Sequence, residues 1–170
     1  MFYGQTFAQW GWNPTQQYWR KYLNDRTRTA VGQRNENFTS GINHRVIRYA
    51  NVLLMHAEAL TEQNQMSAAL PLINRVRQRA SVNLAPLTGT YTQAQLRQLI
   101  RTERARELAG EGTRWFDILR YGLVDDAAGI AELTARDPDF TNFRLGVSKL
   151  LPIPRRDLAI DPNLKQNTGY

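Results

Sequence analysis

The sequence of 170 residues contains no cysteine and only two histidines, His44 and His56. Without cysteine the chain has no disulfide framework, no thiolate metal site and no thiol nucleophile. Two isolated histidines do not form a cluster that suggests a metal site, and no Gly-x-Ser-x-Gly motif marks a serine nucleophile. We therefore expect no metal and no cofactor, and carboxylates are the remaining candidates for catalysis.

The sequence also lacks a long apolar run. No stretch approaches the roughly 18 apolar residues that a membrane-spanning helix needs, and residues 1–5 show no basic region followed by an apolar core, so no signal peptide is visible. A hydrophobic content of 42% with 10% aromatic residues is typical of a globular chain. The length predicts one domain, or part of one, over residues 1–170.

The formal net charge of +7 permits binding to an anionic partner. Where arginines are densest, however, they alternate with acidic residues. This mixture is typical of an ion-paired scaffold and unlike a phosphate-binding stripe, so we expect no nucleic-acid partner. The acidic residues of this stretch, which runs from 103 to 120, are Glu103, Glu107, Glu111 and Asp117.

Hydrophobic spacing predicts an all-α fold. Apolar residues recur every three or four positions over residues 46–63 and again over 67–80, which predicts two helices in an antiparallel hairpin of the tetratricopeptide type. Thr92 and Gln95 form a capping box before a third helix, and a fourth is expected over residues 114–121. We divide the chain into an irregular segment (1–45), a helical core (46–122), and an extended, loop-rich C-terminal wrap (123–170).

Glu103 and Glu107 continue the apolar stripe of the third helix, and this position allows two interpretations. Paired carboxylates can serve as general acid and base when their pKa values are split. Alternatively, a buried carboxylate is ion-paired, and the arginines nearest in sequence are Arg104, Arg106, Arg114 and Arg120. Because no second catalytic element accompanies the pair, we predict a structural clamp between the third and fourth helices and no catalytic residue.

Two groups of aromatic residues have different expected roles. Trp115 and Phe116 lie within an apolar helix and are expected in the core. The N-terminal aromatic residues lie beside Asn and Gln in predicted loop and short helix, where rings stack on sugars and amides bind hydroxyl groups. Closing over the helical hairpin is the alternative role for any one of them. As a group, these are the predicted ligand-binding residues: Trp10, Trp12, Tyr18 and Trp19.

Several segments, in order, resemble the linked motifs of SusD/RagB-family proteins. These are RYANVLLMHAEA (48–59), INRVRQRA (73–80), residues 103–120 with their RWFD core, LPIP (151–154) and NLKQNTGY (163–170). The resemblance implies a mostly helical protein that binds glycans or other nutrients without catalysis, at the outer-membrane surface of Bacteroidetes. It also implies a SusC-like TonB-dependent transporter as partner.

Full members of that family are longer and begin with a signal peptide and a lipidated cysteine. The sequence therefore suggests the C-terminal portion of such a protein, with any membrane association provided by a lipid anchor on the N-terminal portion. Apolar surface left uncovered would favour self-association. A helical-repeat module that binds another protein is the alternative function.

Overall fold

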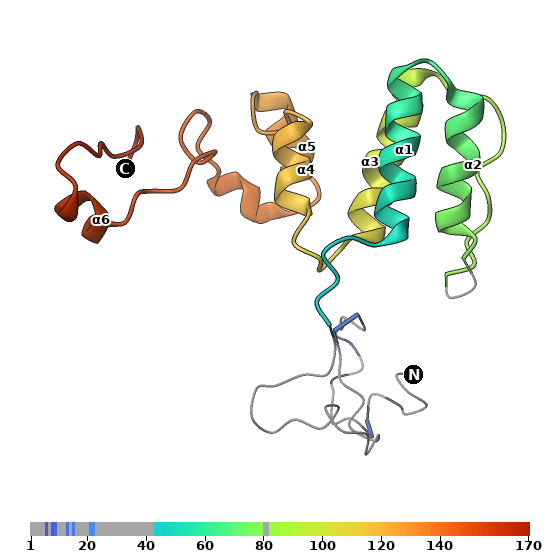
Figure 1. Ribbon diagram of the computed structural model, residues 1–170, viewed down its shortest axis with the longest axis horizontal. Coiled ribbons are helices and arrows are strands. Elements are labelled where there is room, and N and C mark those ends of the chain that lie inside the picture. Colours follow the sequence, from blue (N-terminus) through green and yellow to red (C-terminus); the bar gives the residue numbers. More distant parts are fainter. Residues whose placement is uncertain are drawn as a thin grey trace. The chain divides into compact units, whose positions relative to one another are not determined.

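The computed structural model describes residues 6, 8, 9, 13, 15, 21, 22, 43–79 and 82–170. The regular secondary structure of these residues is entirely helical, which confirms the predicted fold class (Figure 1). The chain forms two compact units, residues 1–112 and residues 113–170.

The first unit contains the predicted helical hairpin. Helix α1 (Tyr49–Glu62) and helix α2 (Met66–Arg77) are joined by three residues, and α1 also packs against helix α3 (Gln93–Glu107). The turn is tight because Asn64 adopts a left-handed conformation, with φ of 60°. Asparagine tolerates this region better than most residues, so its position here fits the turn.

Small side chains allow the three helices to pack closely. Ala57 of α1 and Ala69 of α2 are fully buried, and they share one apolar cluster with Ile73, Leu96 and Ile100. The absence of bulky side chains at the two alanine positions lets the helix axes approach. The buried cluster joins all three helices into one core.

The helix ends agree with the sequence in one case and differ in another. Thr92 and Gln95 form the predicted capping box at the start of α3. The second helix was expected to begin at Ser67, but α2 begins at Met66 and has Gln65 at its N-cap position. Pro71 therefore lies inside the helix, beyond the positions where a proline removes no hydrogen bond.

The second unit begins with helix α4 (Arg114–Arg120), close to the predicted span, and continues with helices that the sequence did not predict. These are α5 (Ala127–Thr134), the 3-10 helix η1 (Pro138–Asn142) and α6 (Arg155–Ile160). In α5 the side chain of Asp126 accepts a hydrogen bond from the Gly129 amide. A Cβ at Gly129 would lie 2.4 Å from the Leu123 carbonyl oxygen, so only glycine fits.

Trp115 and Phe116 were predicted to be core residues, and this prediction was wrong. Their exposed fractions are 39% and 68%. The buried residues of α4 are Asp117 and Ile118, and the Trp115 ring lies at the edge of the buried cluster, against Phe143. Asp117 is buried because Arg120 Nε lies 2.8 Å from its Oδ1 atom. In this seven-residue helix Asp117 and Ile118 occupy the buried positions that were expected for the two aromatic rings.

Side-chain amides fasten the C-terminal segment to the extended stretch before α6. The Gln166 amide donates to the Ile153 carbonyl (2.9 Å) and accepts from the Ile153 amide (2.8 Å), as a neighbouring strand would. Asn167 donates to the Leu151 carbonyl. Residues 151–154 are not helical, as expected from Pro152 and Pro154.

Candidate functional site

The predicted ligand-binding residues Trp10, Trp12, Tyr18 and Trp19 lie outside the described residues. Their described neighbour Lys21 contacts the end of α3. Its ammonium group lies 2.5 Å from Glu111 Oε1 and also donates to the backbone carbonyls of Glu107 and Ala109. Lys21 thus binds both a side chain and the backbone at the end of the helical unit.

The densest constellation of charges in the first unit lies along α3 and just beyond it. Glu103 and Glu107 are 5% and 6% exposed. Arg77 Nη1 of α2 lies 2.9 Å from Glu103 Oε2, and Arg79 Nη2 lies 3.1 Å from Glu107 Oε2. Because the four-residue spacing places both carboxylates on one face of α3, they meet the C-terminal end of α2 together.

Arg48, the residue directly before α1, connects the last two carboxylates. Its Nη1 atom lies 2.9 Å from Glu107 Oε1, without the alignment of a hydrogen bond. Its Nε atom donates to both oxygens of Glu111, at 3.0 and 2.9 Å. Its Nη2 atom donates to the Glu107 carbonyl at 2.9 Å. Arginine's planar fork allows one side chain to make all these contacts.

The same cations satisfy the C-terminal end of α3. The last carbonyls of a helix have no partners within the helix, and the helix dipole concentrates negative charge there. Arg48 and Lys21 both donate to the Glu107 carbonyl, and Lys21 donates to the Ala109 carbonyl. The positive charges of Arg48 and Lys21 therefore lie at the C-terminal end of α3, where both the carboxylates and the helix dipole attract them.

The electrostatics of Glu111 and Arg48 favour the charged forms of both groups. Burial alone would raise the pKa of Glu111, but hydrogen bonds from Arg48 and Lys21, together with their positive charges, lower it below the ordinary 4.5. Burial would lower the pKa of Arg48, and its hydrogen bonds to Glu111 and Glu107 raise it. An acid held in its ionised form is a poor proton donor at neutral pH.

We call the set Arg48, Arg77, Arg79, Glu103, Glu107 and Glu111, with Lys21, the charge cluster. Its geometry supports the structural interpretation of Glu103 and Glu107, since the arginines engage both carboxylates. The arginines differ from those expected, because they come from α2, its C-terminal end and the residue before α1. The clamp accordingly connects α3 to α1 and α2, where the sequence predicted a clamp between the third and fourth helices.

A hollow of about 300 Å³ borders the charge cluster between α1 and α2. Two of its lining residues contact each other, because the guanidinium of Arg75 lies over the Tyr49 ring, 5.5 Å from the ring centroid. The hollow combines positive charge with apolar side chains. Its lining residues are Arg48, Tyr49, Ala50, Leu53, Arg75, Val76 and Arg79.

The described part of the chain contains neither a cluster of potential metal ligands nor a membrane-spanning helix. No three His, Cys, Asp or Glu side chains there come together as a metal site. None of its helices combines the length and the apolar character that crossing a bilayer requires. His56 is exposed on α1, as expected for a solvated histidine.

Comparison with known proteins identifies relatives along nearly the whole chain. A sequence profile of the SusD family matches residues 3–170. SusD-like protein P2 of Formosa agariphila is 38% identical over 143 residues, which are 80% of this chain and 28% of the relative. SusD-like protein P25 of the same organism is 37% identical over 139 residues, 78% of this chain and 26% of the relative. The chain thus spans about a quarter of the length of these proteins.

Solved structures show the same fold. A SusD homologue from Bacteroides thetaiotaomicron superposes with a TM-score of 0.66 at 29% identity, over 86% of this chain and 31% of that one. A SusD superfamily protein from Bacteroides vulgatus gives a TM-score of 0.62 at 30% identity, over 79% of this chain and 29% of that one. These similarities agree with the tetratricopeptide-like helical fold.

Replacing Arg48 with methionine tests the structural role of the charge cluster. Arg48→Met keeps most of the apolar stem but leaves Glu107 and Glu111 without their shared partner, and we expect the free energy of unfolding to fall by about 3 kcal/mol. Urea denaturation measures the change.

Arg97→Met provides the matched control, because the Arg97–Glu62 pair is exposed on both sides. Exposed pairs contribute little, so this variant should unfold almost as the parent does. Equal effects of the two substitutions would show that burial of the charge cluster does not matter for stability.

Proposed function

This chain belongs to the SusD family, and we propose that it serves in the non-catalytic binding of glycans or other nutrients. SusD-like proteins generally bind such nutrients at the cell surface. The observation that carries the proposal is the family match over residues 3–170, which leaves almost no part of the chain unaccounted for. The relatives named above support the same function.

The charge cluster supports a binding function over a catalytic one. Glu103 and Glu107 are the paired carboxylates that a hydrolase would need, yet arginines engage both. General acid–base catalysis requires a carboxyl group that can reach substrate and exchange a proton with it. Both carboxylates are instead buried in ion pairs and are not placed to reach a substrate.

For the ligand contacts we propose the N-terminal aromatic residues Trp10, Trp12, Tyr18 and Trp19. Their composition supports this assignment, because indole and phenol rings beside Asn and Gln meet the mixed apolar and polar surface of a sugar. In this proposal residues 1–45 form the ligand side, residues 46–122 the supporting core, and residues 123–170 a wrap.

The same proposal includes delivery of the ligand to a transporter. SusD family proteins generally act with SusC-like TonB-dependent transporters at the outer-membrane surface, and we propose such a transporter as partner here. Membrane attachment would come from a lipid anchor on an N-terminal portion, as in full-length family members.

The proposed function requires that the protein bind a glycan without cleaving it. On a glycan array the protein should bind at least one class of oligosaccharide, and chromatography after long incubation should recover that oligosaccharide intact. Glu103→Gln should lower the unfolding temperature and leave the absence of turnover unchanged. Release of shorter sugars that disappears in Glu103→Gln would instead identify a hydrolase.

A second candidate function, binding of another protein by a helical-repeat module, is favoured by an apolar stripe on α1. Tyr49, Val52 and Met55 recur every three residues, so they share one helix face. Their exposed fractions are 62%, 43% and 45%. An apolar stripe of this kind is typical of an interaction surface, and in this chain it provides a surface for self-association or for a partner.

Charged substitutions in the apolar stripe of α1 test whether it mediates association. We expect concentration-dependent self-association in sedimentation experiments, and the double variant Val52→Glu, Met55→Glu should shift the protein to monomer because a carboxylate resists desolvation. Ala94→Glu, which adds a carboxylate at an exposed position of α3, is the control for each single variant, Val52→Glu and Met55→Glu. Unchanged association in the double variant would exclude the stripe.

A further inference from the structure

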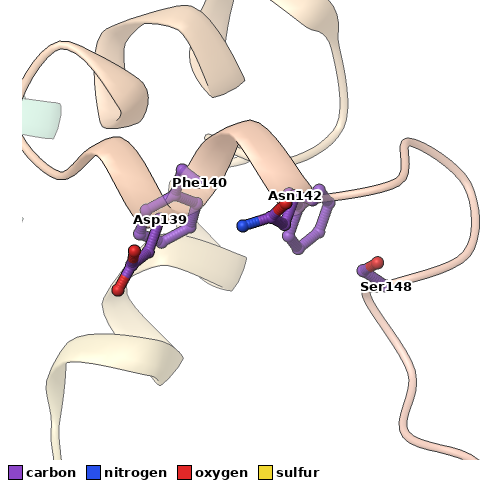
Figure 2. Close-up of a pocket in the computed structure, with 5 residues that line it drawn as sticks. Asp139, Phe140, Asn142 and Ser148 are labelled. Carbon is purple, nitrogen blue, oxygen red and sulfur yellow. The ribbon is translucent and has the colours of Figure 1, made fainter.

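A second hollow lies within the unit formed by residues 113–170. It has a volume of about 320 Å³ and is lined by Asp139, Phe140, Asn142, Phe143 and Ser148. Figure 2 shows Asp139 and Phe140 beside each other, and Ser148 on the loop that follows η1. We call this hollow the η1 pocket.

The 3-10 geometry of η1 sorts the lining residues into two pairs. In a 3-10 helix, residues three apart eclipse each other. Asp139 therefore aligns with Asn142 as a polar pair, and Phe140 aligns with Phe143 as an aromatic pair. The two rings are stacked, with centroids 6.2 Å apart and an interplanar angle of 29°.

Local contacts hold this turn in place. The Asp137 side chain accepts a hydrogen bond from the Asp139 amide at 3.1 Å, and Pro138 fixes the first position of η1. Phe140 and Phe143 pack against the buried cluster of this unit, and the Trp115 ring lies 6.4 Å from the Phe143 ring. The aromatic wall is thus supported from behind and does not depend on a ligand.

The polar pair of the η1 pocket has unused hydrogen-bonding capacity. Within the described residues, neither the Asp139 carboxylate nor the Asn142 amide makes a side-chain hydrogen bond or ion pair, and both side chains are exposed. Other polar side chains of this unit do have partners, such as Ser148, which accepts from the Arg144 amide at 3.0 Å. Asp139 offers two acceptors, and Asn142 offers both donors and an acceptor.

These features match the chemistry of a sugar ring. A pyranose has an apolar C–H face that packs on an aromatic wall and hydroxyl groups that both donate and accept hydrogen bonds. The Asp139 carboxylate and the Asn142 amide each provide hydrogen-bonding atoms for hydroxyl groups. A pocket of about 300 Å³ is at the lower limit for small-molecule sites, which suits a short piece of an oligosaccharide.

We propose that the η1 pocket is a binding subsite for a neutral oligosaccharide, with Phe140 as the aromatic platform and Asp139 and Asn142 as hydrogen-bonding partners. The inference rests on the proposed nutrient-binding function and narrows its substrate class. We expect the oligosaccharide to be neutral because the Asp139 carboxylate repels uronate and sulfate groups. The net charge of +7 would by itself attract acidic glycans, so the η1 pocket reverses the preference expected from the whole chain.

Nuclear magnetic resonance of the ¹⁵N-labelled chain tests the proposal at the residue level. Neutral probes are tetrasaccharides of glucose, mannose and xylose, and acidic probes are tetrasaccharides of galacturonate and guluronate. At least one neutral probe should shift the side-chain amide signals of Asn142. Asn142→Ala and Phe140→Leu should each weaken its binding about tenfold.

Matched variants separate binding from folding. Phe140→Leu retains an apolar side chain against the core and removes only the flat face, and its unchanged backbone spectrum verifies the fold. Asn163→Ala deletes an exposed amide that does not line the η1 pocket, so affinity should stay the same. Asp139→Asn should allow the acidic probes to bind, whereas Asp157→Asn, which removes an exposed carboxylate of α6, should not.

The remaining outcomes overturn the inference in distinguishable ways. A neutral probe that binds but shifts signals only outside the η1 pocket refutes the subsite and leaves the nutrient-binding function standing. Acidic probes that bind in the pocket of the parent protein refute the substrate class. No binding by any probe contradicts both the subsite and the proposed binding of glycans.

Discussion

Removing the carboxylates of α3 from water is the constraint on which the helical unit depends. Glu103 and Glu107 are almost fully buried, and a buried charge destabilises a protein unless a partner of opposite charge is within reach. Their partners come from three places along the chain: the residue before α1, α2 itself and the stretch just after it. Those ends must therefore converge on one face of α3. The apolar contacts of Ala57, Ala69 and Ile73 bring the helices together, and the charge cluster fixes which ends meet.

This arrangement gives the family motifs of the first unit a structural role. The motifs that place the chain in the SusD family include Arg48, Arg77, Glu103 and Glu107, and the structure uses these residues to hold helices together. A scaffold held in this way can support different ligand-binding segments without changing its own chemistry. Lys21 also binds a side chain and the backbone at the end of α3, within the same cluster.

How far the sequence predicts this structure differs from residue to residue. The hairpin and the capping box at Thr92 were predictable because helical periodicity and cap chemistry are local. The partner of Glu107 was not predictable, because Arg48 lies 59 residues away and no spacing rule connects them.

Helix α5 was missed because Gly129 weakens its pattern, although the glycine is needed where Leu123 approaches. Trp115 and Phe116 were misplaced because a seven-residue helix has too few turns to show which face is buried. The η1 pocket depends on a 3-10 turn, whose three-residue period a short loop sequence does not reveal.

A double-mutant cycle between Arg48 and Glu111, measured as a function of pH, tests the central claim most directly. The pKa of Glu111 is lowered by its partners, so its ion pair stabilises the folded state above pH 4.5 and loses this effect as pH falls through the folded-state value. With Arg48→Met and Glu111→Gln, we predict a coupling free energy of about 1–2 kcal/mol at pH 7. The coupling should decline as the pH is lowered below 4.5 and through the folded-state pKa of Glu111. No coupling at pH 7, or a coupling that is independent of pH, would contradict a scaffold held by buried charge.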